Sequence, residues 1–330
     1  MNMRLCSILL CVASMSFAGK TMTFKYDGME ITVLQDKANF MPNKIFHGAP
    51  VEEINEAVPE GKSPASINAF VVKAEKKTME KNDKGKEVEK IIKRTYLIDT
   101  GLSTDTLLKN LRDAGIKPED IDYIFITHMH ADHIGGLLRD GKAAFPKATL
   151  HIAKEEFYYW RQANPNIKQI AYAYLKNTEL FTYGEDLPIV RAEQTETEKN
   201  IGLFRKTKAA KIEQPADDVF RGRDASGHTP GHTVFENNKL IFFGDLVHSA
   251  ALQFADPNIC AQYDMEMPKA VLSRRKFFDE AAETKKLILG AHLPFPGVGF
   301  VLKDEGGHYS YKPLEIKPED IIEKQNKNDN

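Results

Sequence analysis

Thr127-His128-Met129-His130-Ala131-Asp132-His133 is the most informative stretch of this 330-residue sequence, because three histidines and one aspartate lie within six positions. The apolar run 121–126 before it predicts a short strand. Alternate side chains of an extended chain share a face, so His128 and His130 are expected to point to the same side. The turn that follows directs Asp132 and His133 to a neighbouring position. Imidazole and carboxylate groups bind zinc, and also manganese, iron or cobalt, so the stretch predicts a metal site.

The rest of the sequence predicts strands first and then strands alternating with helices. Two β-hairpins are expected, one around the turn Asp27-Gly28 and one from residues 67–72 and 91–98. Further strands are expected at 148–153, 219–221, 233–235, 240–243 and, as the last core strand, 287–289. Helices are expected at 104–114, over 154–180 and from Pro268 to about Lys286. Residues 185–215 fit neither pattern, and the polar tail after Lys317 is expected to fray. This order implies sheets covered by helices.

Four further motifs carry a family resemblance. They are Leu97-Ile98-Asp99-Thr100-Gly101, Gly227-His228-Thr229-Pro230-Gly231-His232-Thr233, Phe242-Phe243-Gly244-Asp245 and Leu289-Gly290-Ala291-His292. Together with H-x-H-x-D-H at 128–133, they resemble the metallo-β-lactamase superfamily from about residue 67 to 300. The resemblance implies an α+β fold, a four-layer αββα sandwich with metals at one edge between the sheets.

The resemblance also implies a ligand set for two divalent metal ions, with zinc expected first. The ligands of the first metal would be His128, His130 and His228, and those of the second Asp132, His133 and His292. Asp245 would bridge both metals, and Asp132 and Asp245 are the candidate catalytic residues. Asp99 would hold a ligand imidazole in place. His232 is expected to make a structural hydrogen bond, and the residues that bind substrate are not identified.

Two such cations make a hydroxide available as a nucleophile near neutral pH, which predicts a hydrolase. His130 stands where the oxygen-reducing members of the superfamily carry an acidic residue, which argues against a redox role. The classical β-lactamases have a cysteine or no ligand at the position of Asp245, which argues against β-lactamase activity. The segment His292–Gly299 resembles the exported branch that includes methyl parathion hydrolase and quorum-quenching lactonases. We therefore expect an ester-like bond to be cleaved, most readily that of a lactone.

Three alternatives remain open at this point. The substrate could be a phosphotriester, or a thioester as in the glyoxalase II-like members, and the chain could be a non-catalytic metal-binding protein. The seven intact ligand positions argue against the last. Aromatic residues that could line a substrate pocket are Phe40, Phe46, Trp160 and Phe254.

The N-terminus has the layout of a secretory signal. A positive start is followed by the apolar run Leu5–Val12 and by Ser16-Phe17-Ala18, which predicts export to the periplasm with cleavage after Ala18. Residues 19–330 would then form a single domain. Cys260 is the only cysteine after residue 18, so no internal disulfide is expected.

Composition and analogy bound the partners. A net charge of -2 disfavours a nucleic-acid partner. No segment is long and apolar enough for a membrane span. A small-molecule substrate is expected, and a homodimer is expected by analogy with the exported relatives.

Overall fold

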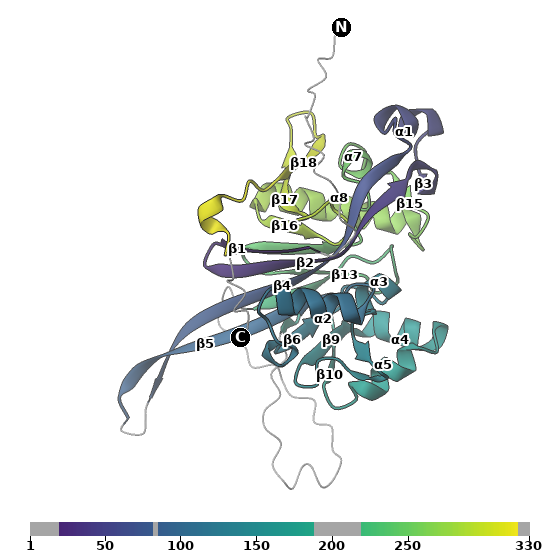
Figure 1. Cartoon of the computed structure of the whole chain (residues 1–330). Coiled ribbons are helices and arrows are strands. Elements are labelled where there is room, and N and C mark those ends of the chain that lie inside the picture. Colours follow the sequence, from purple (N-terminus) through teal and green to yellow (C-terminus); the bar gives the residue numbers. More distant parts are fainter. Residues whose placement is uncertain (1–19, 82–84, 188–218, 323–330) are drawn as a thin grey trace, which may run out of the picture.

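Two β-sheets face each other at the centre of the structure, a computed structural model that describes residues 20–81, 85–187 and 219–322. Among these residues the first sheet has seven strands in the order β1-β2-β4-β5-β6-β9-β10 (Figure 1). Their bounds are β1 Thr21–Tyr26, β2 Met29–Pro42, β4 Lys62–Lys81, β5 Glu87–Ile98, β6 Tyr123–Phe125, β9 Thr149–Ala153 and β10 Thr178–Phe181.

The second sheet also has seven strands in the described chain, in the order β11-β12-β13-β14-β16-β17-β18. Their bounds are β11 Asp186–Leu187, β12 Phe220–Asp224, β13 Thr233–Glu236, β14 Leu240–Gly244, β16 Leu287–Gly290, β17 Val298–Lys303 and β18 Tyr309–Pro313. Two small ribbons complete the strands: β3 Phe46–His47 with β15 Cys260–Ala261, and β7 Leu138–Arg139 with β8 Lys142–Ala143.

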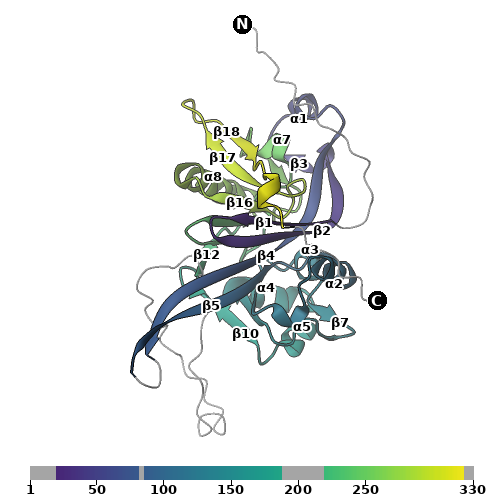
Figure 2. The ribbon, with the colours of Figure 1, turned by 60° about the vertical axis from the view of Figure 1, so that its left-hand side comes forward.

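Helices cover the outer face of each sheet. The α-helices are α1 Val51–Ala57, α2 Thr104–Asp113, α3 Ala131–Ile134, α4 Lys154–Ala163, α5 Ile167–Ala173, α7 Ala250–Gln253 and α8 Met267–Thr284. The 3-10 turns are η1 Asn43–Ile45, η2 Pro118–Asp120 and η3 Pro318–Asp320. In Figures 1 and 2, α2, α4 and α5 lie beside the first sheet and α8 beside the second.

The side-chain alternation of the strands builds the four layers. In β5, Leu97 packs outward in one hydrophobic cluster with Leu107 of α2, whereas its neighbour Tyr96 packs inward between the sheets. In β14, Phe242 packs inward in the cluster with Tyr96, whereas Phe243 packs outward with α8. Because the pleat sends successive side chains to opposite faces, each sheet contributes to two cores. The four-layer αββα sandwich is therefore confirmed.

Parallel pairing brings the chemistry-bearing segments to one edge. The strand β6 is parallel to β5 and β9, and β14 is parallel to β16. The carboxyl end of β6 leads into the histidine motif, that of β14 into Asp245 and that of β16 into His292. Gly244 and Gly290 are register partners, so the last two segments leave their sheet side by side.

Most expected elements are confirmed, and two expectations were wrong. Residues 154–180 are not one helical stretch, because Thr178–Phe181 form β10 and pair in parallel with β9. Residues 287–289 are not the last core strand, because Val298–Lys303 and Tyr309–Pro313 add two antiparallel strands to the same sheet. The described part of the tail after Lys317 contacts β1, because Ile321 forms a bridge with Phe24 and the Ile322 N–H donates to the Thr23 carbonyl at 2.8 Å.

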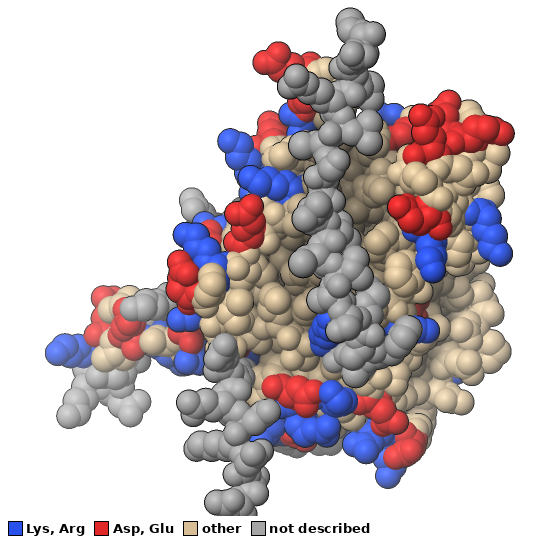
Figure 3. Space-filling view, turned by 45° about the horizontal axis from the view of Figure 1, so that its top comes forward, with Lys and Arg blue, Asp and Glu red and all other residues tan. Residues whose placement is uncertain are grey.

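Several expectations concern segments outside the described residues. They are the signal at 1–18 and most of the unassigned region 185–215. No helix of the described residues is long and apolar enough to cross a membrane. On the face drawn in Figure 3, lysine and arginine side chains alternate with aspartate and glutamate, so this face shows no continuous basic stripe.

Candidate metal centre

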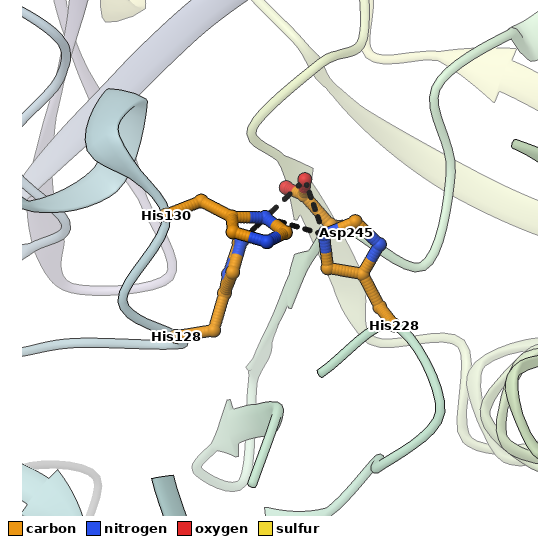
Figure 4. Close-up of side chains that lie close together, drawn as sticks. All are labelled: His128, His130, His228 and Asp245. Carbon is orange, nitrogen blue, oxygen red and sulfur yellow. Dashed lines mark hydrogen bonds and ion pairs between the residues drawn. The ribbon is translucent and has the colours of Figure 1, made fainter. Parts of the chain in front are cut away.

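The proposed ligands come from four separate segments that meet at one edge of the two sheets. His128 and His130 lie in the loop after β6, and His133 lies in the short helix α3. His228 lies between β12 and β13, Asp245 directly after β14 and His292 directly after β16. Figure 4 shows how His128, His130, His228 and Asp245 point toward one another from these segments.

The first group contains three histidines and one carboxylate. The Nδ1 atom of His130 lies 3.0 Å from the Nε2 atoms of both His128 and His228. The Oδ2 atom of Asp245 lies 3.1 Å from His228 Nε2 and 3.6 Å from His128 Nε2. One potential ligand atom from each of the four residues lies within 4.8 Å of the others. This arrangement is compact enough for one cation.

The second group adds a second carboxylate. Its members are Asp132, His133 and His292, and their potential ligand atoms are also within 4.8 Å of one another. His292 Nε2 lies 3.5 Å from Asp132 Oδ2. Asp245 reaches this group as well, with Oδ1 3.0 Å from His133 Nε2 and Oδ2 3.2 Å from His292 Nε2. The Asp245 carboxylate therefore touches both groups, as a bridging ligand must.

Two buried atoms indicate that the cluster fits metal ions. Within the described chain, the buried atoms His133 Nε2 and Asp245 Oδ1 face each other at 3.0 Å, but neither makes a hydrogen bond of good geometry. Buried polar atoms without a partner are costly and need a reason. A divalent cation supplies one, because imidazole nitrogen and carboxylate oxygen are both ligands of zinc and related metals.

The protonation of the cluster follows from burial and mutual charge. Burial and the nearby His228 lower the pKa of His130 to about 4. For His228 burial acts in the same direction, but the Asp245 and Asp264 carboxylates outweigh it and raise its pKa to about 9. Burial opposes ionisation of Asp245 too, yet His133 and His292 hold its pKa well below the usual range. An anionic carboxylate therefore lies between the two histidine groups.

The two residues expected to support the ligands lie beside them. Asp99 accepts hydrogen bonds from the Thr127 N–H and Oγ1–H, each at 2.8 Å, and its Oδ2 lies 2.8 Å from His133 Nδ1. His232 Nε2 accepts the backbone N–H of Asp245 at 2.9 Å. These contacts fix one histidine of the second group and the backbone of the bridging aspartate.

Three buried residues beside the ligands lie outside the set that the sequence motifs single out. His248 Nε2 lies 3.2 Å from Asp245 Oδ2, and its three-residue spacing from Asp245 is a signal that the sequence offers. Asp264 contacts His228, and no motif marks it. Glu156 accepts the N–H of Met129, and it too lies outside every motif.

The candidate pocket aromatics divide into two groups. The Trp160 ring lies edge-on to the His130 imidazole at 5.3 Å between centroids. Phe46 and Phe254 do not line an open pocket, because each is buried in a hydrophobic cluster. Phe40 is exposed, and its ring packs under the Lys62 ammonium. Tyr263, which no sequence motif marks, is 44% exposed, and its ring centroid lies 6.1 Å from that of His248.

Comparisons with known proteins agree with this geometry. The model of the metallo-beta-lactamase superfamily matches residues 92–294. The crystal structure of hydrolase AbOPH of the beta-lactamase superfamily is 27% identical, with a TM-score of 0.69 over 92% of this chain and 100% of that one. AidC, a dizinc quorum-quenching lactonase solved with an N-acyl-L-homoserine product, is 24% identical, with a TM-score of 0.68 over the same shares.

Curated relatives match over short segments only. The exodeoxyribonuclease WalJ of Streptococcus pneumoniae is 47% identical over 45 residues, which are 14% of this chain and 17% of that protein. The anti-Pycsar protein Apyc1 of Bacillus phage BSP38 is 61% identical over 41 residues, 12% of this chain and 15% of its own. The chain thus spans less than a fifth of the length of these two relatives.

Proposed function

This chain belongs to the metallo-β-lactamase superfamily, and on that basis we propose that it is a binuclear-metal hydrolase that cleaves an ester-like bond, with lactones as its preferred substrates. The observation that carries the proposal is the position of Asp245, whose two oxygens lie against His133 on one side and His228 on the other. A carboxylate shared by two histidine groups has a clear use in holding two cations together, and a protein that only stores a metal has no need of it.

The chain's own residues supply positioning and charge. Two bound divalent cations would provide a nucleophile at neutral pH and polarise the substrate carbonyl. Asp132 is one of the two proposed ligands that are not fully buried, with 29% of its side chain accessible, so it borders the space from which a substrate arrives. Burial raises the pKa of Asp132, but His133 and His292 outweigh it and the net shift is downward. An ionised Asp132 can orient a nucleophile by accepting a hydrogen bond from it. In the reaction it can then take that proton and pass it to the leaving oxygen.

Two features favour lactones as the substrate class. Trp160 beside His130 and Tyr263 beside His248, which contacts Asp245, place aromatic surface near the metal centre, which suits an ester with an apolar portion. The segment His292–Gly299 resembles the exported branch that contains lactonases and methyl parathion hydrolase. AidC, at 24% identity, supports the fold alone, and its acyl-homoserine product makes acyl-homoserine lactones the first compounds to test.

The test is acid release in a pH-stat by zinc-loaded or manganese-loaded protein. The panel comprises acyl-homoserine and γ-lactones, an aryl ester, a phosphotriester, a thioester and a β-lactam, which all release acid on hydrolysis. We expect the fastest turnover on lactones, with loss of turnover in Asp245→Ala and after chelation. A dominant thioester or phosphotriester rate would replace the lactone proposal. Silence of a metal-loaded protein across the panel would favour a non-catalytic metal-binding role.

Export to the periplasm and a homodimer are also proposed. Residues 1–18 support the first, and analogy with exported relatives supports the second. Expression in a Gram-negative host followed by osmotic shock should release a protein whose N-terminus is Gly19. An uncleaved N-terminus in the cytosolic fraction would contradict export.

Light scattering of the purified protein separates a dimer from a monomer.

A further inference from the structure

Two buried charged residues lie behind the His228 imidazole, on the side away from the proposed metals. Asp264 Oδ1 lies 2.9 Å from His228 Nδ1, while His228 Nε2 faces Asp245. Asp264 Oδ2 accepts the Ala261 N–H at 3.1 Å and a guanidinium N–H of Arg274 at 3.3 Å. The side chains of Asp264 and Arg274 are 0% and 1% exposed, so the pair is enclosed by protein.

Arg274 makes more contacts than a counter-charge requires. From α8, its Nε–H donates to the Leu246 carbonyl at 2.6 Å, and its Nη1 group donates to the carbonyls of Pro257 and Ile259 at 2.8 and 3.0 Å. Leu246 directly follows the bridging Asp245. One guanidinium therefore ties α8 to the segment after Asp245, to the strand β15 region and to Asp264, and its rigid fork suits this geometry.

We propose that Asp264 and Arg274 are a positioning pair that fixes His228 with Nε2 toward the metal centre, and that they set the affinity of the His128–His130–His228 position for its cation. A carboxylate that accepts a hydrogen bond from the far ring nitrogen fixes the tautomer and makes the ligand nitrogen a better donor.

The second position has a different support. There Asp99 holds His133, and its other hydrogen bonds come from the neutral backbone and hydroxyl groups of Thr127. No arginine or lysine forms an ion pair with Asp99 in the described chain, whereas Asp264 pairs with Arg274. The two cation positions thus differ in their supporting charges, and a change at Asp264 should affect one position and leave the other in place.

The test is a cobalt titration of the metal-free protein, residues 19–330. The visible absorption of bound cobalt and competition with a chelator give a dissociation constant for each position. Wild type, Asp264→Asn, Arg274→Met and Arg274→Lys are compared. Phe277→Leu is the control, because Phe277 is buried on the same helix, in the hydrophobic cluster between α8 and the second sheet. Asp99→Asn is the matched variant for the other position.

We expect Asp264→Asn and Arg274→Met to weaken one binding event by about 10- to 100-fold while the other changes little. Arg274→Lys keeps the charge without the fork and should lie between Arg274→Met and wild type. Asp99→Asn should weaken the other event. If Asp264→Asn does not fold by circular dichroism, Arg274→Lys alone decides, by weakening one event selectively or not.

Three results would overturn the pairing. One is two unchanged dissociation constants in folded Asp264→Asn or Arg274→Lys. Another is an equal loss in Phe277→Leu, which would mean that general destabilisation is the cause. The last is wild-type protein that takes up no cobalt, which would also contradict the proposed metal-dependent function on which this inference rests. The first two results would overturn the pairing and leave the metal-dependent function standing.

Discussion

Glu156 joins the two loops that carry the first three ligands, and its replacement by glutamine is the most informative single change. The Oε1 atom of Glu156 accepts the Met129 N–H at 2.7 Å, in the loop of the histidine motif. Its Oε2 atom accepts the Thr229 hydroxyl at 2.8 Å and the Gly231 N–H at 2.9 Å, in the loop that carries His228. Glu156 itself is fully buried on α4.

The cost of Glu156→Gln follows from this geometry. Every group that faces Glu156 in these bonds is a donor, so the new amide NH₂ must face a donor in either orientation. One buried N–H then loses its acceptor at a cost of about 1–3 kcal/mol, and the remaining bonds lose the strength that a charged acceptor gives. We expect the free energy of unfolding to fall by about 2–4 kcal/mol, which leaves a domain of ordinary stability folded.

Urea denaturation of the metal-free protein measures this loss, and a chelator competition at the same pH measures metal affinity. Both should decrease in Glu156→Gln, because the two ligand loops lose their common anchor. Glu155→Gln is the matched control, since Glu155 is exposed on the same helix turn. A Glu156→Gln protein within about 0.5 kcal/mol of wild type, with unchanged metal affinity, would refute the reasoning.

Three further changes test other parts of the account. Gly231→Ala should lower the free energy of unfolding by about 1–3 kcal/mol in urea denaturation, because the added Cβ would lie 2.2 Å from the backbone nitrogen of Glu156; an unchanged midpoint would contradict the close approach. Trp160→Ala should raise KM for an acyl lactone by about tenfold, with a smaller change in kcat, because the substrate loses an aromatic contact. A variant with the KM of wild type in steady-state kinetics would remove Trp160 from the substrate site. Burial opposes ionisation of Glu236, but Lys286 and Arg223 outweigh it and lower its pKa below 4.5. The ionised carboxylate therefore stabilises the fold above that pH, and this contribution is lost as the pH falls. Glu236→Gln should flatten the acid side of the curve of unfolding free energy against pH, and parallel curves for the two proteins would contradict this.

Local patterns predict most of the strands and helices and the histidine motif, whereas the four-layer sandwich and the full ligand set come from the family resemblance. The pleat alone separates Leu97 from Tyr96, and the spacing of the histidine motif places His128 and His130 on one side of a strand end. Asp264 and Arg274 could not be predicted in the same way. Asp264 lies 36 residues from His228 in the chain and reaches it only through the tertiary fold, and a buried arginine in a helix reads as a surface residue until its acceptors are known.

The missed strands have a similar physical explanation. The segment Thr178–Phe181 is short and follows two helices, so its strand character comes from parallel pairing with β9 and not from its own pattern. The segment Tyr309–Pro313 is also short, and as an edge strand it exposes mostly polar positions, so its strand character comes from antiparallel pairing with β17. Aromatic candidates such as Phe254 were ambiguous because an aromatic residue near a motif packs in a core as readily as in a pocket.

Anomalous diffraction from crystals of the zinc-loaded protein, recorded above and below the zinc edge, tests the central claim most directly. The account predicts two zinc peaks. One should lie about 2.0–2.2 Å from ligand atoms of His128, His130 and His228, the other at similar distances from Asp132, His133 and His292, with Asp245 bonded to both. A single peak, or a second zinc bound by His248 in place of Asp132, would contradict it.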